Sequence, residues 1–196
     1  MHKTDEARAL ALKALNEAPP AILFRKPLDY VLADHLRQRM LCRFLDEIAA
    51  ETQRDVEVIA AALRFLKTDF GLHIIDEEED LFPLLRRRTP PGDRLNEVMG
   101  ELSLEHADAK PAADQIIEGL AASLAAPEDR PNTPVSQDLL TRFAANERRH
   151  LVAENAIILP LARAHLRPDD LRTLGKRMAA RRGLDFPEAA DAVRPA

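Results

Sequence analysis

The sequence predicts an all-α protein, built as an antiparallel up-and-down four-helix bundle with short additional helices at its N- and C-terminal ends. Glycine is scarce, with 6 residues, and aromatic residues make up 4% of the chain, whereas the strong helix formers Ala, Leu, Arg and Glu fill long stretches. The 14 prolines gather mostly in a few clusters, which separate segments instead of interrupting them. Between the clusters, apolar residues recur at spacings of three and four, as on the buried face of a helix.

Four long segments carry this periodicity. The four long helices are predicted at about residues 28–50, 54–88, 93–125 and 136–165. Shorter helices are predicted near residues 5–16 and 168–182. We therefore expect residues 1–27 to form an N-terminal helical extension, residues 28–165 the bundle, and residues 166–196 a C-terminal helix and tail. Because short connections join the long helices, successive helices should run in opposite directions.

Each long helix has one histidine in the middle of its apolar stripe. These histidines are His35, His73, His106 and His150. In the fourth helix, the predicted stripe consists of Leu139, Phe143, His150, Glu154, Ile157 and Leu161. One buried histidine is usually satisfied by hydrogen bonds, but four imidazoles on four facing stripes need a common partner, and a metal ion is the simplest one.

The second and fourth long helices share the pattern H-x3-E-x5-P. Its two copies are His73–Glu77–Pro83 and His150–Glu154–Pro160. Residues four apart lie one turn above each other on the same helix face, so each His–Glu pair can reach one buried point. An unpaired carboxylate in a protein core is strongly unfavourable, and coordination of a cation removes that penalty.

Four imidazoles and two carboxylates are too many ligands for one tetrahedral zinc ion, and they suit two first-row metal ions bridged by both glutamates. The predicted ligands are His35, His73, Glu77, His106, His150 and Glu154. We expect two iron ions with an oxo or hydroxo bridge and one open position on each ion. Donors of this type also accept manganese or zinc.

The chain resembles the hemerythrin-like HHE cation-binding domains, a family of four-helix bundles that enclose a non-haem di-iron site. The resemblance rests on His35, on residues 73–83, on Glu105–His106 and on residues 150–160, and it covers about residues 28–165. By position it implies the same six ligands. The oxygen carriers of the family have one further histidine, four residues after the ligand of the third helix, where this chain has Lys110. In this respect the chain is similar to bacterial proteins linked to repair of damaged iron centres and to iron- or oxygen-responsive HHE proteins.

Composition argues against several other classes of protein. A net charge of −5 leaves no general basic surface for nucleic acid. No apolar run approaches the roughly 18 residues that span a bilayer. The first 20 residues lack the positively charged segment followed by an apolar segment that is typical of a signal peptide. The single cysteine, Cys42, cannot form an intramolecular disulfide. We expect a cytoplasmic protein without nucleic-acid or membrane partners, and the sequence names no protein partner.

These features favour a di-iron protein that binds or senses O2, NO or peroxide, in oxidative or nitrosative stress response or in iron-centre repair. One alternative is an enzyme, a di-metal oxidase or peroxidase that turns over a small oxidant at the same site. The other is a metal-free helical interaction module, whose core histidines only form hydrogen bonds.

Several residues near the predicted site have two readings. Lys110 either extends into solvent or directs its ammonium group at the open metal position. Glu147, three residues before His150, is either an auxiliary ligand or an acceptor for an imidazole N–H. Cys42 is expected in the apolar core and Tyr30 in packing at a helix end.

The acidic run of residues 76–80 wraps around its helix. Glu77 is predicted to face inward and most of its neighbours to be solvated. Glu78 is the ligand that would replace Glu77 if the helix were rotated.

Overall fold

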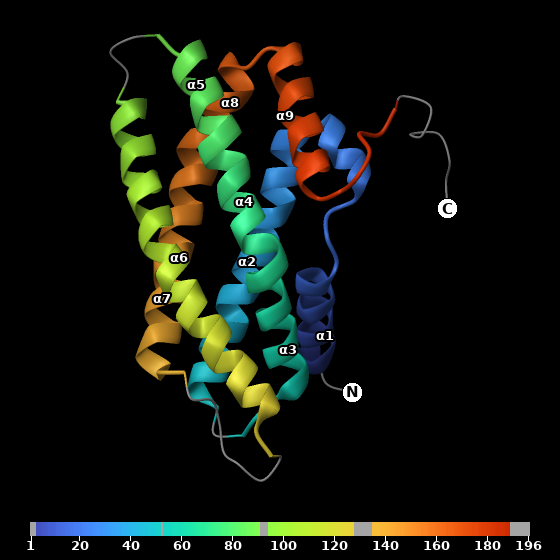
Figure 1. Cartoon of the computed structure of the whole chain (residues 1–196), viewed down its shortest axis with the longest axis vertical. Helices are drawn as coiled ribbons and strands as arrows, with labels where there is room; N and C mark the ends of the chain where they lie inside the picture. The colour runs from blue at the N-terminus through green and yellow to red at the C-terminus, as the bar shows by residue number, and fades with distance from the viewer. Residues whose placement is uncertain (1–2, 52, 91–93, 128–134, 189–196) are drawn as a thin grey trace.

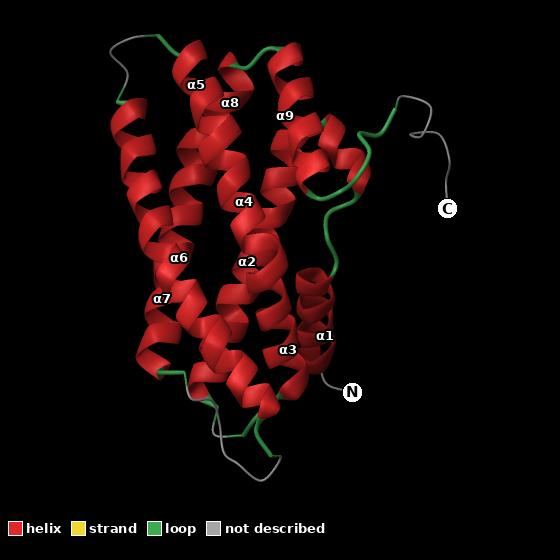
Figure 2. Ribbon diagram, in the orientation of Figure 1, coloured by secondary structure: helices red, strands yellow, loops and turns green. Residues whose placement is uncertain are grey.

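The computed structural model describes residues 3–51, 53–90, 94–127 and 135–188, and these residues form helices joined by short connections, with no strand among them (Figure 2). The prediction of an all-helical protein is confirmed. The elements form four long rods, and two accessory helices pack beside them (Figure 1).

The first rod is one uninterrupted helix. It is preceded by the accessory helix α1 (Lys3–Asn16) and by a 3-10 turn, η1 (Ala21–Arg25). The rod itself is α2 (Pro27–Ala50), and Pro27 stands in its first turn, where a missing backbone N–H is tolerated.

The second rod is helical throughout but changes its winding twice. Its parts are α3 (Val56–Phe65), the π-turn η2 (Leu66–Phe70), α4 (Gly71–Asp76), the π-turn η3 (Glu77–Leu81) and α5 (Phe82–Arg88). The carboxylate of Asp55 accepts a hydrogen bond from the backbone N–H of Val58 and so caps the start of α3. The sequence predicted this rod as a single regular helix, and the two π-turns are the difference.

The third and fourth rods complete the bundle. They are α6 (Leu95–Ala125), followed by α7 (Gln137–Ala153), the π-turn η4 (Glu154–Ile158) and α8 (Leu159–His165). The second accessory helix, α9 (Pro168–Arg181), comes last. Ser136 caps the start of α7 by accepting from the backbone N–H of Leu139.

The rods lie side by side and are connected at alternate ends (Figure 1). The rod made of α7 and α8 packs along α2, and α3 packs against α6. Two ion pairs show that the first and fourth rods run in opposite directions. Asp29 near the start of α2 pairs with Arg163 of α8, whereas Asp46 near the end of α2 pairs with Arg148 of α7. Helix α9 packs on η1, α2 and α4, and α1 packs on α2 and α3.

The apolar core consists of two clusters with a polar layer between them. On α2, Leu28 and Val31 belong to one cluster, and His35 separates them from the other. The residues of α2 in that other cluster are Leu41, Cys42, Phe44, Leu45, Ile48 and Ala49. The same order holds on α6, where His106 separates Leu102 from Ala113. Burial of apolar side chains above and below therefore positions a polar layer in the middle of the bundle.

In the fourth rod, the apolar stripe differs from the predicted one after Glu154. Ile157 was expected to face the core but is 36% exposed, whereas Ile158 and Ala162 are fully buried. The π-turn η4 contains one residue more per turn than an α-helix, so the buried positions move by one residue beyond it. The prediction for Ile157 was wrong because it assumed regular α-helical spacing.

Among the described residues, no helix is both long enough and apolar enough to cross a membrane.

Candidate metal centre

The six predicted ligands all lie in the polar layer of the bundle. His35 comes from α2 and His106 from α6, whereas α4 with η3 supplies His73 and Glu77, and α7 with η4 supplies His150 and Glu154. All six are buried, and both glutamates are completely inaccessible to solvent. The structure therefore brings together residues that are up to 119 positions apart in the sequence.

Each glutamate is the first residue of a π-turn. The backbone N–H of Phe82 donates to the carbonyl of Glu77, and that of Leu159 donates to the carbonyl of Glu154, five residues back in both cases. The next residue in each rod is the proline of the repeated pattern. Because proline has no N–H and its ring clashes with the carbonyl four residues back, it disfavours a regular α-turn, and the wider turn relieves the clash. The proline of H-x3-E-x5-P thus belongs to the geometry that presents the glutamate.

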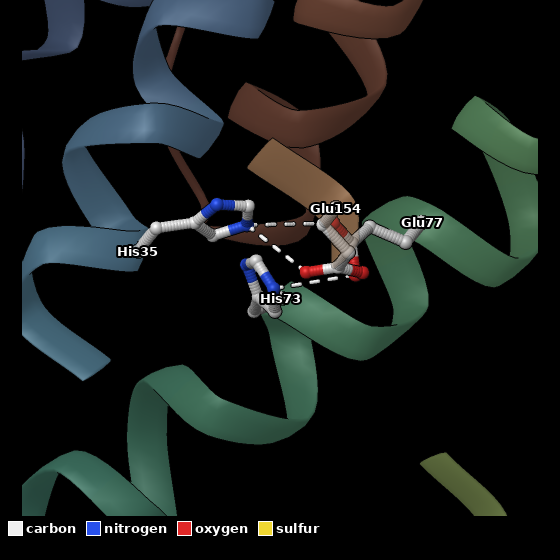
Figure 3. Close-up of side chains that lie close together, drawn as sticks. All are labelled: His35, His73, Glu77 and Glu154. Carbon is white, nitrogen blue, oxygen red and sulfur yellow. Dashed lines mark ion pairs between the residues drawn. The ribbon is translucent and has the colours of Figure 1, made fainter. Parts of the chain in front are cut away.

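One half of the candidate centre consists of His35 and His73 with both glutamates (Figure 3). His35 Nε2 lies 3.4 Å from Glu154 Oε2 and 3.6 Å from Glu77 Oε1. His73 Nε2 lies 3.3 Å from Glu77 Oε2. The ligand atoms of this group all lie within 4.8 Å of one another, so one ion can contact all four residues. We call this group the His35/His73 half.

The other half consists of His106 and His150 with the same two glutamates. His150 Nε2 lies 3.0 Å from Glu154 Oε1, and His106 Nε2 lies 3.4 Å from Glu77 Oε2. This group, the His106/His150 half, also fits within 4.8 Å. Both glutamates are therefore shared between the halves, as two bridging carboxylates would be.

The inner ligand atoms have no partners in the protein. All four Nε2 atoms and all four carboxylate oxygens are buried and form no hydrogen bond within the part of the chain that the structure describes. The distance of 3.0 Å between His150 Nε2 and Glu154 Oε1 does not satisfy either atom, because both are acceptors when the histidine carries its proton on Nδ1. Buried polar atoms without partners are strongly unfavourable, and a convergent set with two carboxylates fits bound cations.

The outer nitrogen of each histidine faces an acceptor. His35 Nδ1 is 2.9 Å from Asn155 Oδ1, His106 Nδ1 is 2.7 Å from Glu78 Oε1, His150 Nδ1 is 2.7 Å from Glu105 Oε2, and His73 Nδ1 is 3.4 Å from Asp34 Oδ2. We call these four residues the outer acceptors. At His35, His106 and His150, a proton on Nδ1 that is donated to the acceptor leaves the Nε2 lone pair free for a metal ion and fixes the orientation of the ring. The contact of His73 with Asp34 is longer, and Asp34 Oδ2 forms no hydrogen bond among the described residues.

Each outer acceptor adjoins a candidate ligand in the sequence but serves a histidine of another rod. Asp34 precedes His35 yet faces His73, and Asn155 follows Glu154 yet faces His35. Sequence reasoning did not identify either role. A polar residue directly beside a buried ligand was the available signal, but its partner depends on how the rods pack.

The family comparison agrees with this geometry. Residues 26–162 match the family described as the hemerythrin HHE cation binding domain. The chain belongs to this family. A comparison with curated proteins found no match. The resemblance deduced from the two His–Glu pairs is confirmed, and the HHE domain has two overlapping His/Glu groups that can hold metal.

The neighbouring carboxylates shift the pKa values of His73 and His150 in this HHE domain. Burial disfavours the imidazolium form of His73, but Glu77 and Asp34 outweigh burial and hold the pKa of His73 well above its usual value. Burial acts in the same way on His150, and its contacts with Glu154 and Glu105 raise its pKa to about 9. Burial is likewise outweighed at Glu77, where the surrounding histidines hold the pKa of the carboxyl well below its usual value. The site thus favours positive charge at its centre.

The structure shows where the four other residues near the HHE site lie. Lys110 is exposed on α6, so its ammonium group is in solvent. Cys42 is fully buried in the apolar core, and burial raises the pKa of its thiol to about 12. Tyr30 stacks on Phe24 with ring centroids 4.5 Å apart, at the start of α2. Glu147 is buried near His150, in the wall of a pocket between α6 and α7.

The acidic run differs from the prediction. Most neighbours of Glu77 were expected in solvent, but Asp76 and Asp80 are only 1% and 4% exposed, and Glu79 alone is exposed. Three arginines at the C-terminal end of helix α9 pair with the two aspartates. Arg181 of α9 contacts both carboxylates, Arg177 of α9 contacts Asp80, and Arg182, directly after α9, contacts Asp76. The prediction was wrong because the residues flanking Glu77 are covered by a helix from the other end of the chain.

Glu78 is not oriented toward the inner cluster. It accepts from His106 Nδ1 through one carboxylate oxygen and from the hydroxyl of Ser103 through the other, at 2.9 Å. Glu77, rather than Glu78, therefore points into the centre of the bundle.

Proposed function

We propose that this HHE domain is a cytoplasmic di-iron protein that binds or senses O2, NO or peroxide, in response to oxidative or nitrosative stress or in iron-centre repair. The observation that supports it most directly is the set of eight buried inner atoms without partners, arranged as two groups that share Glu77 and Glu154. Two imidazoles and two carboxylates for each ion form a mixed nitrogen and oxygen donor set of the kind that first-row metals prefer.

The proposed ligands are His35, His73, Glu77, His106, His150 and Glu154. When bound, an iron pair supplies redox chemistry and coordination positions for a small molecule. The protein supplies the rest. The outer acceptors place a ring proton on Nδ1 and orient Nε2 toward the centre, the shared glutamates offset the charge of the cations, and the apolar clusters on both sides exclude bulk water.

We assign the metal-binding unit to residues 28–165 and accessory roles to the terminal helices. Buried Arg37 supports the accessory role of α1. It donates to the carbonyl of Leu15 at the end of α1 and to Asp34, which faces His73. At the other end of the chain, Arg181 holds Asp76 next to Glu77. The accessory helices therefore brace residues that adjoin the proposed ligands.

Metal analysis of the freshly purified full chain, together with its visible spectrum, tests the proposal. We expect about two iron ions per chain, the number that six ligands in two groups hold, and a spectrum that changes on addition of NO or O2. Two manganese or zinc ions instead of iron would correct the identity of the metal. Absence of any metal, with a Tm that chelators do not change, would support the interaction module and contradict the proposal.

A further inference from the structure

A pocket of about 340 Å³ lies between α6 and α7, beside the His106/His150 half. Its wall includes His150, a proposed ligand, and the buried carboxylate of Glu147. Four apolar residues form much of the remaining wall: Ala109, Ala112, Leu139 and Phe143. A small molecule in this pocket is therefore in contact with a proposed ligand of one of the two ions.

The outer acceptors of the two halves also differ in their exposure to solvent. At the His106/His150 half, the side chains of Glu105 and Glu78 are 48% and 30% exposed. At the His35/His73 half, the side chain of Asp34 is 2% exposed and is covered by Arg37, which also binds Asp69 and the end of α1. Glu105 and Glu78 are therefore closer to the surface than Asp34, whereas Asn155, the other outer acceptor of the His35/His73 half, is half-buried.

Charged side chains of both signs line the pocket, and exposed Asp108 is one of them. Exposed Arg142 and Arg149 lie at the pocket, and each has a polar partner, Asp138 and Asn146 respectively. The buried residue Glu147 is acidic, and Glu105 adds a second carboxylate beside His150. A carboxylate in a poorly solvated wall repels an anion much more strongly than the same group does in water, and it does not repel a neutral molecule.

Burial is the main cause that raises the pKa of Glu147, to about 7. Cations bound nearby stabilise the ionised carboxylate and lower that pKa. A pH of 8 lies above the raised pKa of Glu147, so its carboxylate form predominates there.

We propose that this pocket is the access route for small ligands to the ion held by His106 and His150, and that Glu147 selects neutral molecules such as NO, O2 and hydrogen peroxide over anions such as azide. This inference rests on the function proposed above. It adds which of the two ions an external ligand reaches and which charge that ligand carries.

The test measures association rates by rapid mixing with the iron-loaded full chain at pH 8, with NO for the reduced protein and azide for the oxidised protein. Ala109→Phe fills the pocket, and Ala107→Phe is its control because Ala107 is exposed on the same helix and does not line the pocket. We expect Ala109→Phe to slow both ligands about tenfold, which corresponds to about 1.4 kcal/mol of added barrier. Ala107→Phe should leave both rates unchanged.

Charge selection is tested with Glu147→Gln, which keeps the shape of the side chain and removes its charge. Its control is Glu101→Gln on the exposed face of α6. We expect Glu147→Gln to speed azide binding on the order of tenfold, because it removes a negative charge that repels the anion in the pocket. NO is neutral, so its binding rate should not change.

Several outcomes would overturn the inference. Equal rates for Ala109→Phe and Ala107→Phe would show that ligands enter elsewhere. Equal effects of Glu147→Gln on azide and NO would remove the charge selection, and loss of iron from this variant would make Glu147 a ligand instead. If Ala109→Phe does not load iron, Ala112→Leu fills the same pocket, and its rates decide the question. Failure of the proposed function itself is distinguished beforehand, because the unmodified chain would then contain no iron, or its spectrum would not change on addition of NO or O2.

Discussion

The two halves of the candidate metal centre have matching inner side chains and different surroundings. Each half has two histidines and the same two glutamates, which the repeated pattern H-x3-E-x5-P presents from two π-turns. Outside the ligands, the His35/His73 half has the amide of Asn155 and a carboxylate, Asp34, that is paired with an arginine. The His106/His150 half has two partly exposed carboxylates and the pocket. The repeat therefore determines the inner geometry, and the packing of neighbouring helices makes the halves unequal.

The π-turns show the same contrast. The turn that begins at Glu77 is flanked by Asp76 and Asp80, which arginines at the C-terminal end of α9 hold in place. The turn that begins at Glu154 follows Ala153 and has no acidic neighbour of this kind. Helix α9 therefore braces one of the two shared glutamates and not the other.

The largest expected effect tests what the halves share. Glu77→Gln removes a carboxylate that belongs to both groups, so both ions should be lost, and metal analysis should find little iron. Glu79→Gln is the matched control, because Glu79 is exposed two residues away. Retention of two iron ions by Glu77→Gln would show that this carboxylate does not hold the metal.

The next prediction separates the halves by the burial of their outer acceptors. Asp34→Asn leaves buried Arg37 without one of its carboxylate partners, so we expect it to lower the free energy of unfolding of the metal-free protein by about 3 kcal/mol. Glu105→Gln changes a side chain that is 48% exposed, and we expect a loss below about 1 kcal/mol. Urea unfolding of both variants measures the difference, and equal losses would contradict the asymmetry.

The pH dependence should differ between metal-free and iron-loaded protein. In the metal-free state the pKa of His150 is raised from 6.5 to about 9, so its contribution to stability is complete below pH 6.5 and disappears as the pH rises through 9. Urea unfolding of the metal-free protein should therefore give a lower free energy at pH 9.5 than at pH 6.5.

The iron-loaded protein should respond in the opposite sense, because protons compete with metal ions for the imidazoles. Bound iron is expected to be lost as the pH falls from 7 to 4, and dialysis followed by metal analysis measures this loss. An iron content that does not change over that interval would argue against histidine ligands.

The smallest effect concerns the brace on one π-turn. Arg181→Gln removes the contacts of Arg181 with Asp76 and Asp80 and leaves those of Arg182 and Arg177, so Glu77 is held less firmly, and iron affinity should fall about tenfold. Arg148→Gln removes an ion pair that is 42% exposed on both sides, on the rod that carries Glu154, and should leave iron affinity unchanged. Competition with a chelator compares the two variants, and equal affinities would show that α9 does not support the centre.

The sequence predicted more of the inner site than of its surroundings. Spacings within one rod placed His73 with Glu77 and His150 with Glu154, and the structure brings these pairs together with the two remaining histidines. It did not predict the shift of the buried stripe from Ile157 to Ile158, because a π-turn changes the helical period on which the prediction relied. The burial of Asp76 and Asp80 was also missed, since the arginines that cover them lie about 100 residues away.

By itself, the sequence determined the helical class, the family and the side chains that face one buried layer, because these depend on spacings within single helices and on the chemistry of histidine and glutamate. Only the tertiary structure decided which acceptor serves which histidine, which outer acceptors approach the surface and which glutamate is braced by α9. Those features arise from the alignment of one helix against another, which is set by side-chain packing along their whole length and is not encoded in any short segment.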